Sequence, residues 1–216
     1  AYVNLMKKVF PDKEFKATGM MKEVERCRMA IEDAMSGKDV AMISSGDSGI
    51  YGMAGIIYQL AEEMGADIEI DCVPGITAAA SSASILGAPL MHDFAIISLS
   101  DLMTPLDLIM KRVDRAADAD MIIALYNPKS KGRTECLDQA RNIVLRYRSP
   151  DTPVGVVRNA GREDETHWIT TLGELDDSKV DMFCLVTIGN SKTYVSKGRM
   201  ITPRGYPVRG GRETEE

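Results

Sequence analysis

The chain has 216 residues, a net charge of −6 and 44% hydrophobic residues, which is ordinary for a globular protein of one large or two small domains. No apolar run approaches the roughly 20 residues that a membrane helix needs. The N-terminal stretch AYVNLMKKVF also lacks the order of a signal peptide. Lys and Arg are scattered apart from a small C-terminal group, whereas nucleic-acid-binding proteins usually carry a basic stripe. We therefore expect a cytoplasmic protein that binds neither a membrane nor a nucleic acid.

The residue types that hold metals are sparse and widely spaced. The four cysteines form no C-x-x-C motif, and His92 and His167 are not spaced as ligands. We predict no metal site. Cys27 and Cys72 lie in apolar patterns, so we interpret the cysteines as buried free thiols.

Helices and strands alternate through the first part of the chain. The pattern predicts a helix capped by Thr18 and ending near Ser36, because apolar residues recur there at three- and four-residue steps. The elements expected after it are a strand at 39–45, a helix at 49–65, a strand at 68–73, a helix at 77–87 and a strand at 94–100. We place a domain boundary near Met91 to Asp93, so the predicted domains are 1–92 and 93–216.

The second part begins with the same alternation and then becomes rich in β-type runs. Thr104 and Pro105 predict the start of a helix that runs through Ala117. The other expected elements are a strand at 121–126, a helix at 134–147, strands at 153–159, 167–172, 183–189 and 193–201, and a brief helical patch near 172–176. This order predicts an α/β protein with mostly parallel strands, followed by a sheet with antiparallel members. The polar residues 207–216 read as a mobile tail.

The most informative loop is SSGDSGIYG, at residues 44–52, between an expected strand and an expected helix. Loops at the carboxyl ends of strands are the usual ligand positions in open α/β sheets. Asp47 offers a carboxylate that could pair with a ligand ammonium or accept bonds from ribose hydroxyls. The alternative is a tight turn in which Asp47 caps the next helix, and the spacing does not decide between the two.

Three further loops follow apolar runs. The turn VPGIT precedes a helix of Ala and Ser that either approaches a flat ligand or is simply well packed. In LYNPKSKGRT, Tyr126 could stack on a planar group and Lys129 could meet acidic substituents, although a solvated charged loop is the commoner outcome. In VVRNAGRE, Arg158 and Arg162 suit bidentate binding of carboxylates. The joint occurrence of these loops favours a ligand cleft.

Five segments together resemble the tetrapyrrole (corrin/porphyrin) methylases, and among them the precorrin-3B methyltransferase type of cobalamin biosynthesis. They are SSGDSGIYGMAG, VPGITAAASSASILGAPLMHDFAIISLSDLMTP, LYNPKSKGRTECLDQAR, SPDTPVGVVRNAGRE and VDMFCLVTIGNSKTYVSKGRMITPRGY. The resemblance covers nearly the whole chain. It implies two α/β domains with a cofactor cleft between them, a homodimer, and S-adenosylmethionine as cofactor. The implied substrate is precorrin-3B or cobalt-factor III, methylated at carbon 17 with ring contraction.

The resemblance also implies site residues by position. Cofactor contacts would fall on ten residues: Ser45, Gly46, Asp47, Ile50, Thr77, Ala78, Tyr126, Asn127, Asn159 and Ala160. Substrate carboxylates would meet Lys129, Arg158 or Arg162, and His92 and Asp101 are the candidates for proton transfer. Such enzymes open with a strand and a G-x-G-P-G type loop. This sequence begins where that unit would already have ended, so we expect a fold without its opening strand and incomplete activity.

Two alternatives stay open. One is a related enzyme of the same fold that acts at another tetrapyrrole carbon, on a protein or on RNA. The other is a non-catalytic tetrapyrrole-binding or scaffolding protein. The acidic composition disfavours RNA, and YNPKSKGRT favours the cobalamin assignment.

Overall fold

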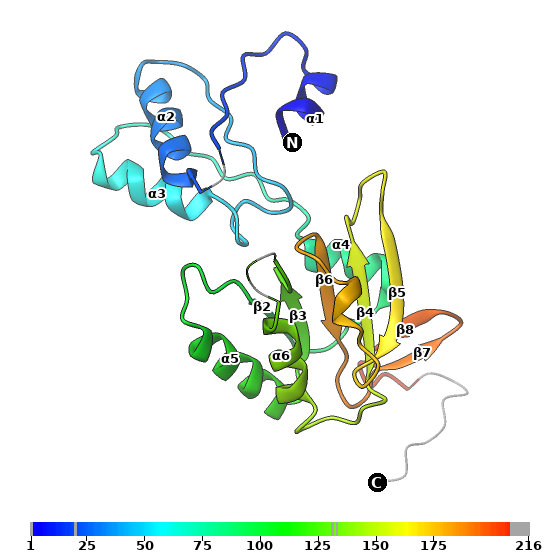
Figure 1. Ribbon diagram of the computed structural model, residues 1–216. Helices are drawn as coiled ribbons and strands as arrows, with labels where there is room; N and C mark the ends of the chain where they lie inside the picture. Colours follow the sequence, from blue (N-terminus) through cyan, green and yellow to red (C-terminus); the bar gives the residue numbers. More distant parts are fainter. Residues whose placement is uncertain (1, 20, 131, 133, 208–216) are drawn as a thin grey trace. The chain divides into compact units, whose positions relative to one another are not determined.

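The structure is a computed structural model that describes residues 2–19, 21–130, 132 and 134–207 (Figure 1). Residues 208–216 of the predicted tail 207–216 lie outside the described residues. The chain forms two compact units, Ala1–Thr77 and Ala78–Glu216, and each unit is described by itself. Among the described residues, no helix is both long enough and apolar enough to cross a membrane.

The first unit is built from helices and extended segments. Its helices are α1 (Tyr2–Val9), α2 (Glu23–Met35) and α3 (Ala54–Glu63). Helices α2 and α3 bury a small core made of Cys27, Ile31, Leu60 and Ala61. The predicted strands at 39–45 and 68–73 are extended but take part in no ladder among the described residues. Met42, Ile68 and Ile70 nevertheless pack against this core, which explains their apolar pattern.

The second unit contains the sheets. Its elements are α4 (Ala78–Leu86), β1 (Gly87–Ala88), β2 (Phe94–Ser98), α5 (Leu106–Asp118), β3 (Ile122–Tyr126), α6 (Cys136–Val144), β4 (Pro153–Arg158), β5 (Thr166–Thr171), the 3-10 helix η1 (Asp177–Lys179), β6 (Cys184–Ile188), β7 (Tyr194–Ser196) and β8 (Arg199–Ile201). The larger sheet has the order β2-β3-β6-β4-β5, and a smaller one has the order β1-β8-β7.

Strand β6 makes the larger sheet mixed. Strands β2 and β3 are parallel, whereas β6 runs antiparallel to both β3 and β4, and β4 is antiparallel to β5. Strands β3 and β4 therefore point the same way on either side of β6. The carboxyl ends of β2, β3 and β4 and the amino end of β6 lie at one edge of the sheet.

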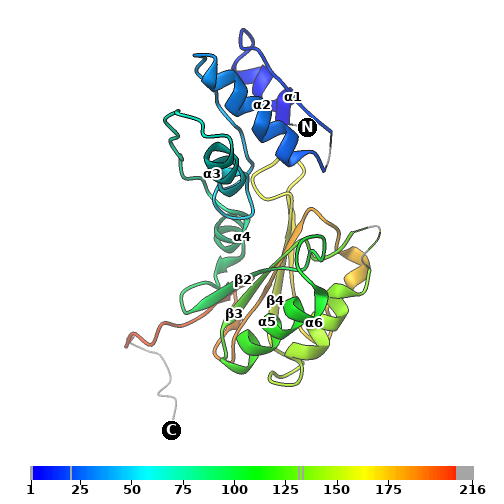
Figure 2. The same cartoon turned by 90° about the vertical axis from the view of Figure 1, so that its left-hand side faces the viewer.

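Side chains alternate between the two faces of this sheet, as a period of two requires. Helices α5 and α6 cover one face, and α4 lies against the other (Figures 1 and 2). Ile123 and Leu125 point to the α5 and α6 side, while Ala124 contacts the cluster that holds Ala79 of α4. Because both faces are covered, the strands read as continuous apolar runs.

A glycine permits the close packing of α4. A β-carbon at Gly155 of β4 would lie 2.4 Å from Cδ1 of Leu86, which is fully buried on α4. The apolar side of α4 is thus packed against the sheet of the second unit. This packing explains why the units divide after Thr77 and not near Met91 to Asp93, where the alternation of elements suggested the boundary.

The predicted helix caps differ from the structure. Helix α2 begins at Glu23, and Thr18 instead accepts a hydrogen bond from Nε of Arg26 at 3.0 Å. Pro105 occupies the N-cap of α5 without a side-chain bond. The helical patch expected at 172–176 is a turn at 172–174, and the 3-10 helix η1 follows it at Asp177–Lys179.

Candidate functional site

In the first unit, Asp47 joins the loop 44–52 to the turn at Pro74 and Gly75. Its Oδ1 accepts a hydrogen bond from the backbone N–H of Gly49 at 2.8 Å, and its Oδ2 accepts one from the N–H of Gly75 at 2.9 Å. These N–H groups, that of Gly75 foremost, hold the pKa of the Asp47 carboxyl below its usual value. The carboxylate is therefore the charged link between two loops.

The interpretation of Asp47 as a helix cap is wrong. Helix α3 begins at Ala54, and its N-cap residue Met53 makes no side-chain cap bond. Asp47 lies several residues earlier, and its carboxylate oxygens bind N–H groups outside any helix. The side chain thus organises loops and not the start of α3.

The two loops also touch at other points. A β-carbon on Gly75 would lie 2.0 Å from the carbonyl oxygen of Gly46, so only glycine fits there. Oγ of Ser48 lies 3.1 Å from Sγ of Cys72. Cys72 is exposed, so its predicted burial is wrong, whereas Cys27, Cys136 and Cys184 are buried free thiols. The segments 46–48 and 72–75 form one connected structure.

A hollow of about 480 Å³ extends from this loop along the first unit. Ser44, Gly46 and Ser48 line one part of it, and the rest is lined mainly by apolar residues of α2, α3 and the segments 39–45 and 68–73, together with Glu69 and Asp71. Two neighbouring apolar side chains are also accessible, Ile50 at 37% and Tyr51 at 57% exposure. The loop therefore offers polar backbone and apolar surface side by side.

In the second unit, the predicted residues gather at the edge formed by the carboxyl ends of β2, β3 and β4. The hydroxyl of Tyr126, the last residue of β3, accepts a hydrogen bond from the N–H of Ala79 at 2.7 Å. Nδ2 of Asn127 donates to Oγ of Ser98, at the end of β2, at 2.9 Å. The first contact fixes the first turn of α4, which begins at Ala78, relative to the end of β3, and the second joins the ends of β2 and β3.

The loop after β4 is held by acidic side chains. Nε of Arg158 donates to Asp181 at 2.9 Å, and Nδ2 of Asn159 donates to Asp164 at 2.6 Å. The Arg158 guanidinium also lies 5.7 Å from the ring centre of Phe183. Burial raises the pKa of Asp181, but the bonds from Arg158 and from the Phe183 N–H outweigh it and leave that pKa below its ordinary value. Ala160 follows, half-buried beside the core that contains Leu86.

The three predicted substrate cations have different surroundings. Nζ of Lys129 donates to Oδ2 of Asp177 at 2.8 Å, and its side chain is only 19% exposed. Arg158 is paired with Asp181, as described above. The Arg162 side chain is exposed and forms no ion pair with any acidic group in the described part of the chain. Arg162 is thus the cation best able to meet an external carboxylate.

The two candidates for proton transfer are not brought together. Asp101 follows β2 at the sheet edge that carries Ser98, whereas His92 precedes β2 and is at the opposite end of the strand. A five-residue strand separates such ends by roughly 17 Å. The exposed His92 ring accepts a hydrogen bond from the adjacent Asp93 N–H at 2.9 Å. Only Asp101 shares an edge with Tyr126 and Asn127.

Left-handed backbone conformations mark three of the predicted loops. Tyr51, Asn127 and Asn159 have φ angles of 54°, 49° and 53°. Asparagine tolerates this region, but for an aromatic residue such as Tyr51 it is uncommon. Strained residues of this kind cluster at ligand sites, where the surrounding contacts hold them in place. Their positions support a binding role for these loops.

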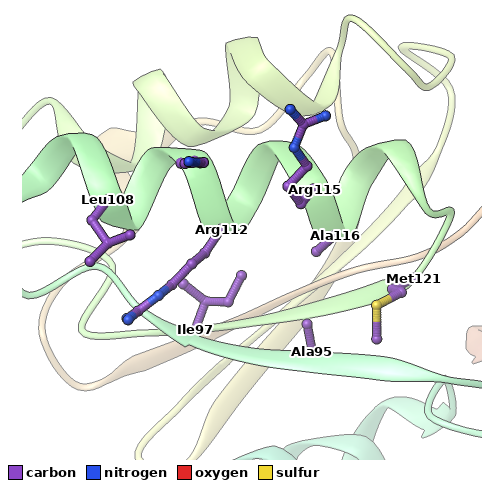
Figure 3. A pocket seen from close by; sticks show the side chains of 8 residues that line it. Ala95, Ile97, Leu108, Arg112, Arg115, Ala116 and Met121 are labelled. Carbon is purple, nitrogen blue, oxygen red and sulfur yellow. The ribbon is translucent and has the colours of Figure 1, made fainter.

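A second hollow, also of about 480 Å³, lies between β2 and α5 (Figure 3). Ala95 and Ile97 line it from the strand, and Leu108, Arg112 and Ala116 line it from the helix. None of the residues predicted to contact cofactor or substrate lines it.

Several organising residues were missed at the level of sequence. Asp181, Asp164 and Asp177 each hold a predicted site residue, and Ser98 holds Asn127. Asp181 lies at the amino end of a strand, whereas the loops that the sequence indicates follow carboxyl ends. It precedes β6, whose antiparallel direction brings its amino end to the same edge. The signal available for it was an acidic residue placed just before an apolar run.

The fold is that of an α/β protein whose loops gather at the carboxyl ends of parallel strands, the usual ligand position in open α/β sheets. Residues 3–176 match the family described as Tetrapyrrole (Corrin/Porphyrin) Methylases. The chain belongs to this family.

Named relatives and a solved structure agree with that membership. The chain is 52% identical over 207 residues to the "Probable cobalt-factor III C(17)-methyltransferase" of Salmonella typhimurium, a match that covers 96% of this chain and 86% of the relative. It is 47% identical to the "Cobalt-factor III methyltransferase" of Priestia megaterium, which covers 95% of this chain and 39% of that longer protein. The crystal structure of the methyltransferase CobJ superposes with a TM-score of 0.82 at 32% identity, covering 86% of this chain and 79% of CobJ.

Proposed function

We propose that this protein transfers a methyl group from S-adenosylmethionine to carbon 17 of cobalt-factor III, with contraction of the macrocycle, in cobalamin biosynthesis. The observation that carries the proposal is the 52% identity over 96% of the chain to the Salmonella typhimurium relative of that printed name. Both named relatives act, by their names, on the cobalt-containing substrate, so we prefer it to precorrin-3B.

We propose that the cofactor is bound by residues of the strand-end loops. In the first unit these are Ser45, Gly46 and Ile50 of the loop that Asp47 organises, and Thr77; in the second they are Ala78, Tyr126, Asn127, Asn159 and Ala160. The local structure fits a nucleoside with a charged tail. Backbone groups approach closely at Gly46, and apolar surface is accessible at Ile50 and Tyr51.

The cofactor supplies an electrophilic methyl group on a sulfonium, which is already a good leaving group. The residues of this chain would therefore act mainly by positioning and by excluding water. As the new carbon–carbon bond forms, the carbon–sulfur bond breaks. Asp101 is proposed to move protons during ring contraction, because it shares the sheet edge with Tyr126 and Asn127.

Substrate carboxylates are proposed to meet Arg162 first. Its side chain is exposed, whereas Lys129 and Arg158 already pair with Asp177 and Asp181. Lys129 and Arg158 could bind a substrate carboxylate only in addition to the aspartate with which each is already paired. An Arg guanidinium is suited to two parallel bonds with a carboxylate.

The test is incubation of the purified protein with S-adenosylmethionine and either cobalt-factor III or precorrin-3B, followed by mass spectrometry. The proposal expects the cobalt compound to gain one methyl group. Bound but unaltered macrocycle would support a binding protein and overturn the enzymatic proposal. Gain of a methyl only on precorrin-3B would move the preference to the cobalt-free substrate.

We also propose that the protein acts in the cytoplasm as a homodimer. The resemblance to the tetrapyrrole methylases is the basis for both statements. Light scattering coupled to size-exclusion chromatography tests the dimer, and a mass of one chain at micromolar concentration would contradict it.

A further inference from the structure

The carboxylate of Asp47 joins two loops of the first unit. Each of its oxygens already binds one backbone N–H, of Gly49 in its own loop and of Gly75 in the other. Asp47 and Gly75 are separated by 28 positions in the chain, so this is a tertiary contact. The side chain is only partly exposed, although Gly75 lies at the surface.

The contact with Gly75 is the charged one among the contacts described between the two loops. The segments at 39–45 and 68–73 take part in no ladder among the described residues, so strand pairing does not set the position of Gly75. The loops also meet where Gly75 approaches the Gly46 carbonyl and where Ser48 lies beside Cys72. Neither of these involves a formal charge, and hydrogen bonds to charged groups are the stronger kind.

We infer that Asp47 is a positioning residue, which fixes the turn at Pro74 and Gly75 against the loop 44–52 and acts on the cofactor through that turn. This inference rests on the proposed function. It differs from a direct contact with the ligand, in which the carboxylate would pair with the ammonium group or with ribose hydroxyls. In the positioning role, the turn and the loop form one preorganised surface before any ligand binds.

The first test uses the ligand-free protein, so it does not depend on the proposed function. Amide hydrogen exchange at Gly75 is measured by NMR for the wild type, Asp47→Ala and Asp47→Asn. The positioning role expects roughly ten-fold faster exchange at Gly75 in Asp47→Ala, the effect of losing a bond to a charged acceptor. Asp47→Asn keeps one acceptor oxygen and should give an intermediate rate. Unchanged exchange at Gly75 in a folded Asp47→Ala protein would overturn the inference.

The second test compares two ligands by titration calorimetry. S-adenosylhomocysteine carries an amino-acid tail, and 5′-methylthioadenosine lacks it. The positioning role expects Asp47→Ala to weaken both by the same factor, about ten-fold, with partial rescue in Asp47→Asn. A loss confined to S-adenosylhomocysteine would show direct contact with the ammonium and contradict the inference.

A matched control is Asp39→Asn, an exposed carboxylate of the same unit for which the described structure gives no hydrogen bond. It should change neither the exchange at Gly75 nor the affinities. If the wild type binds neither ligand, the proposed cofactor fails, while the exchange result still decides whether Asp47 fixes the turn. Circular dichroism of each variant distinguishes a moved turn from a failure to fold.

Discussion

In the second unit, the candidate loops continue directly from hydrogen-bonded strands, whereas in the first unit they follow extended segments without a ladder. The positions of Tyr126 and Asn159 are fixed by β3 and β4, which are buried on both faces. The loop around Asp47 depends on a few side-chain and backbone contacts with the turn at Gly75. A binding surface can therefore be preorganised either by a sheet or by one charged acceptor, and the second solution is easier to disrupt.

The largest expected effect comes from a truncation in the sheet. Ile123→Ala should destabilise the protein by about 3 kcal/mol, because a fully buried side chain between β3 and the α5 and α6 layer is lost. Ile31→Ala, in the smaller core of the first unit, should cost less, since the extended segments around it can move into the cavity. Urea denaturation with hydrogen exchange in each unit measures both. An equal or larger cost at Ile31 would contradict the comparison.

The next largest effect is expected when the contact between the two loops of the first unit is broken. Gly75→Ala places a methyl group against the Gly46 carbonyl, so the turn must move away. We expect the affinity for S-adenosylhomocysteine to fall about ten-fold or more, since a displaced turn loses hydrogen bonds. Calorimetry measures the affinity, and exchange in the second unit should stay unchanged.

The matched control for this variant is Gly55→Ala, on α3, where an added β-carbon meets no other atom within 4 Å. It should leave the affinity unchanged and stabilise the helix by up to about 1 kcal/mol. If Gly55→Ala weakened the ligand as much as Gly75→Ala, the contact between the loops would not be the cause.

A smaller effect on substrate binding distinguishes Arg162 from Lys129 and Arg158 in the second unit. Arg162→Gln should raise KM for the tetrapyrrole about three- to ten-fold with little change in kcat, because it removes an exposed charge pair with substrate. Lys111→Gln, an exposed lysine on α5 without an ion pair in the described structure, serves as the control. An unchanged KM for Arg162→Gln would point instead to Lys129 or Arg158 as the cation that meets the substrate.

The smallest expected effect is a difference in the reactivity of the cysteine thiols of the two units. Cys72 is exposed beside the Asp47 loop, whereas burial raises the pKa of Cys184 on β6 to about 11. The reactive form of a thiol is the thiolate, so Cys184 should react slowly at pH 8. We expect one of the four thiols to react fast with a disulfide reagent, and Cys72→Ser to abolish that phase. A fast phase that persists in Cys72→Ser would show that a buried thiol is accessible.

The second unit could be predicted from sequence more fully than the first. The apolar runs at β2, β3 and β4 and the amphipathic pattern of α5 identify these elements because their packing is periodic. The expected strands of the first unit have the same pattern, but a strand forms only when a partner lies beside it, and pattern does not reveal partners. The hydrogen bond from the Gly75 N–H to Asp47 could not be predicted from sequence either, because the donor is a backbone group far from Asp47 along the chain.

The candidate site was predictable in its positions and not in its chemistry. The ends of β3 and β4 bring Asn127 and Asn159 to the same edge of the sheet, with β6 between them. Sequence could not show that Arg158 and Lys129 were already neutralised by Asp181 and Asp177. Ion pairs between distant segments follow from topology, here from the reversed direction of β6.

Strand β6 also sets a distance at this edge of the sheet. Because β6 lies between β3 and β4, the residues that follow those two strands are two strand spacings apart, or about 10 Å. A molecule that contacts the backbone of both Asn127 and Asn159 must bridge about that distance, which suits a nucleoside better than a simple ion. The inner strand β6 thereby sets the spacing between the backbones of these two loops.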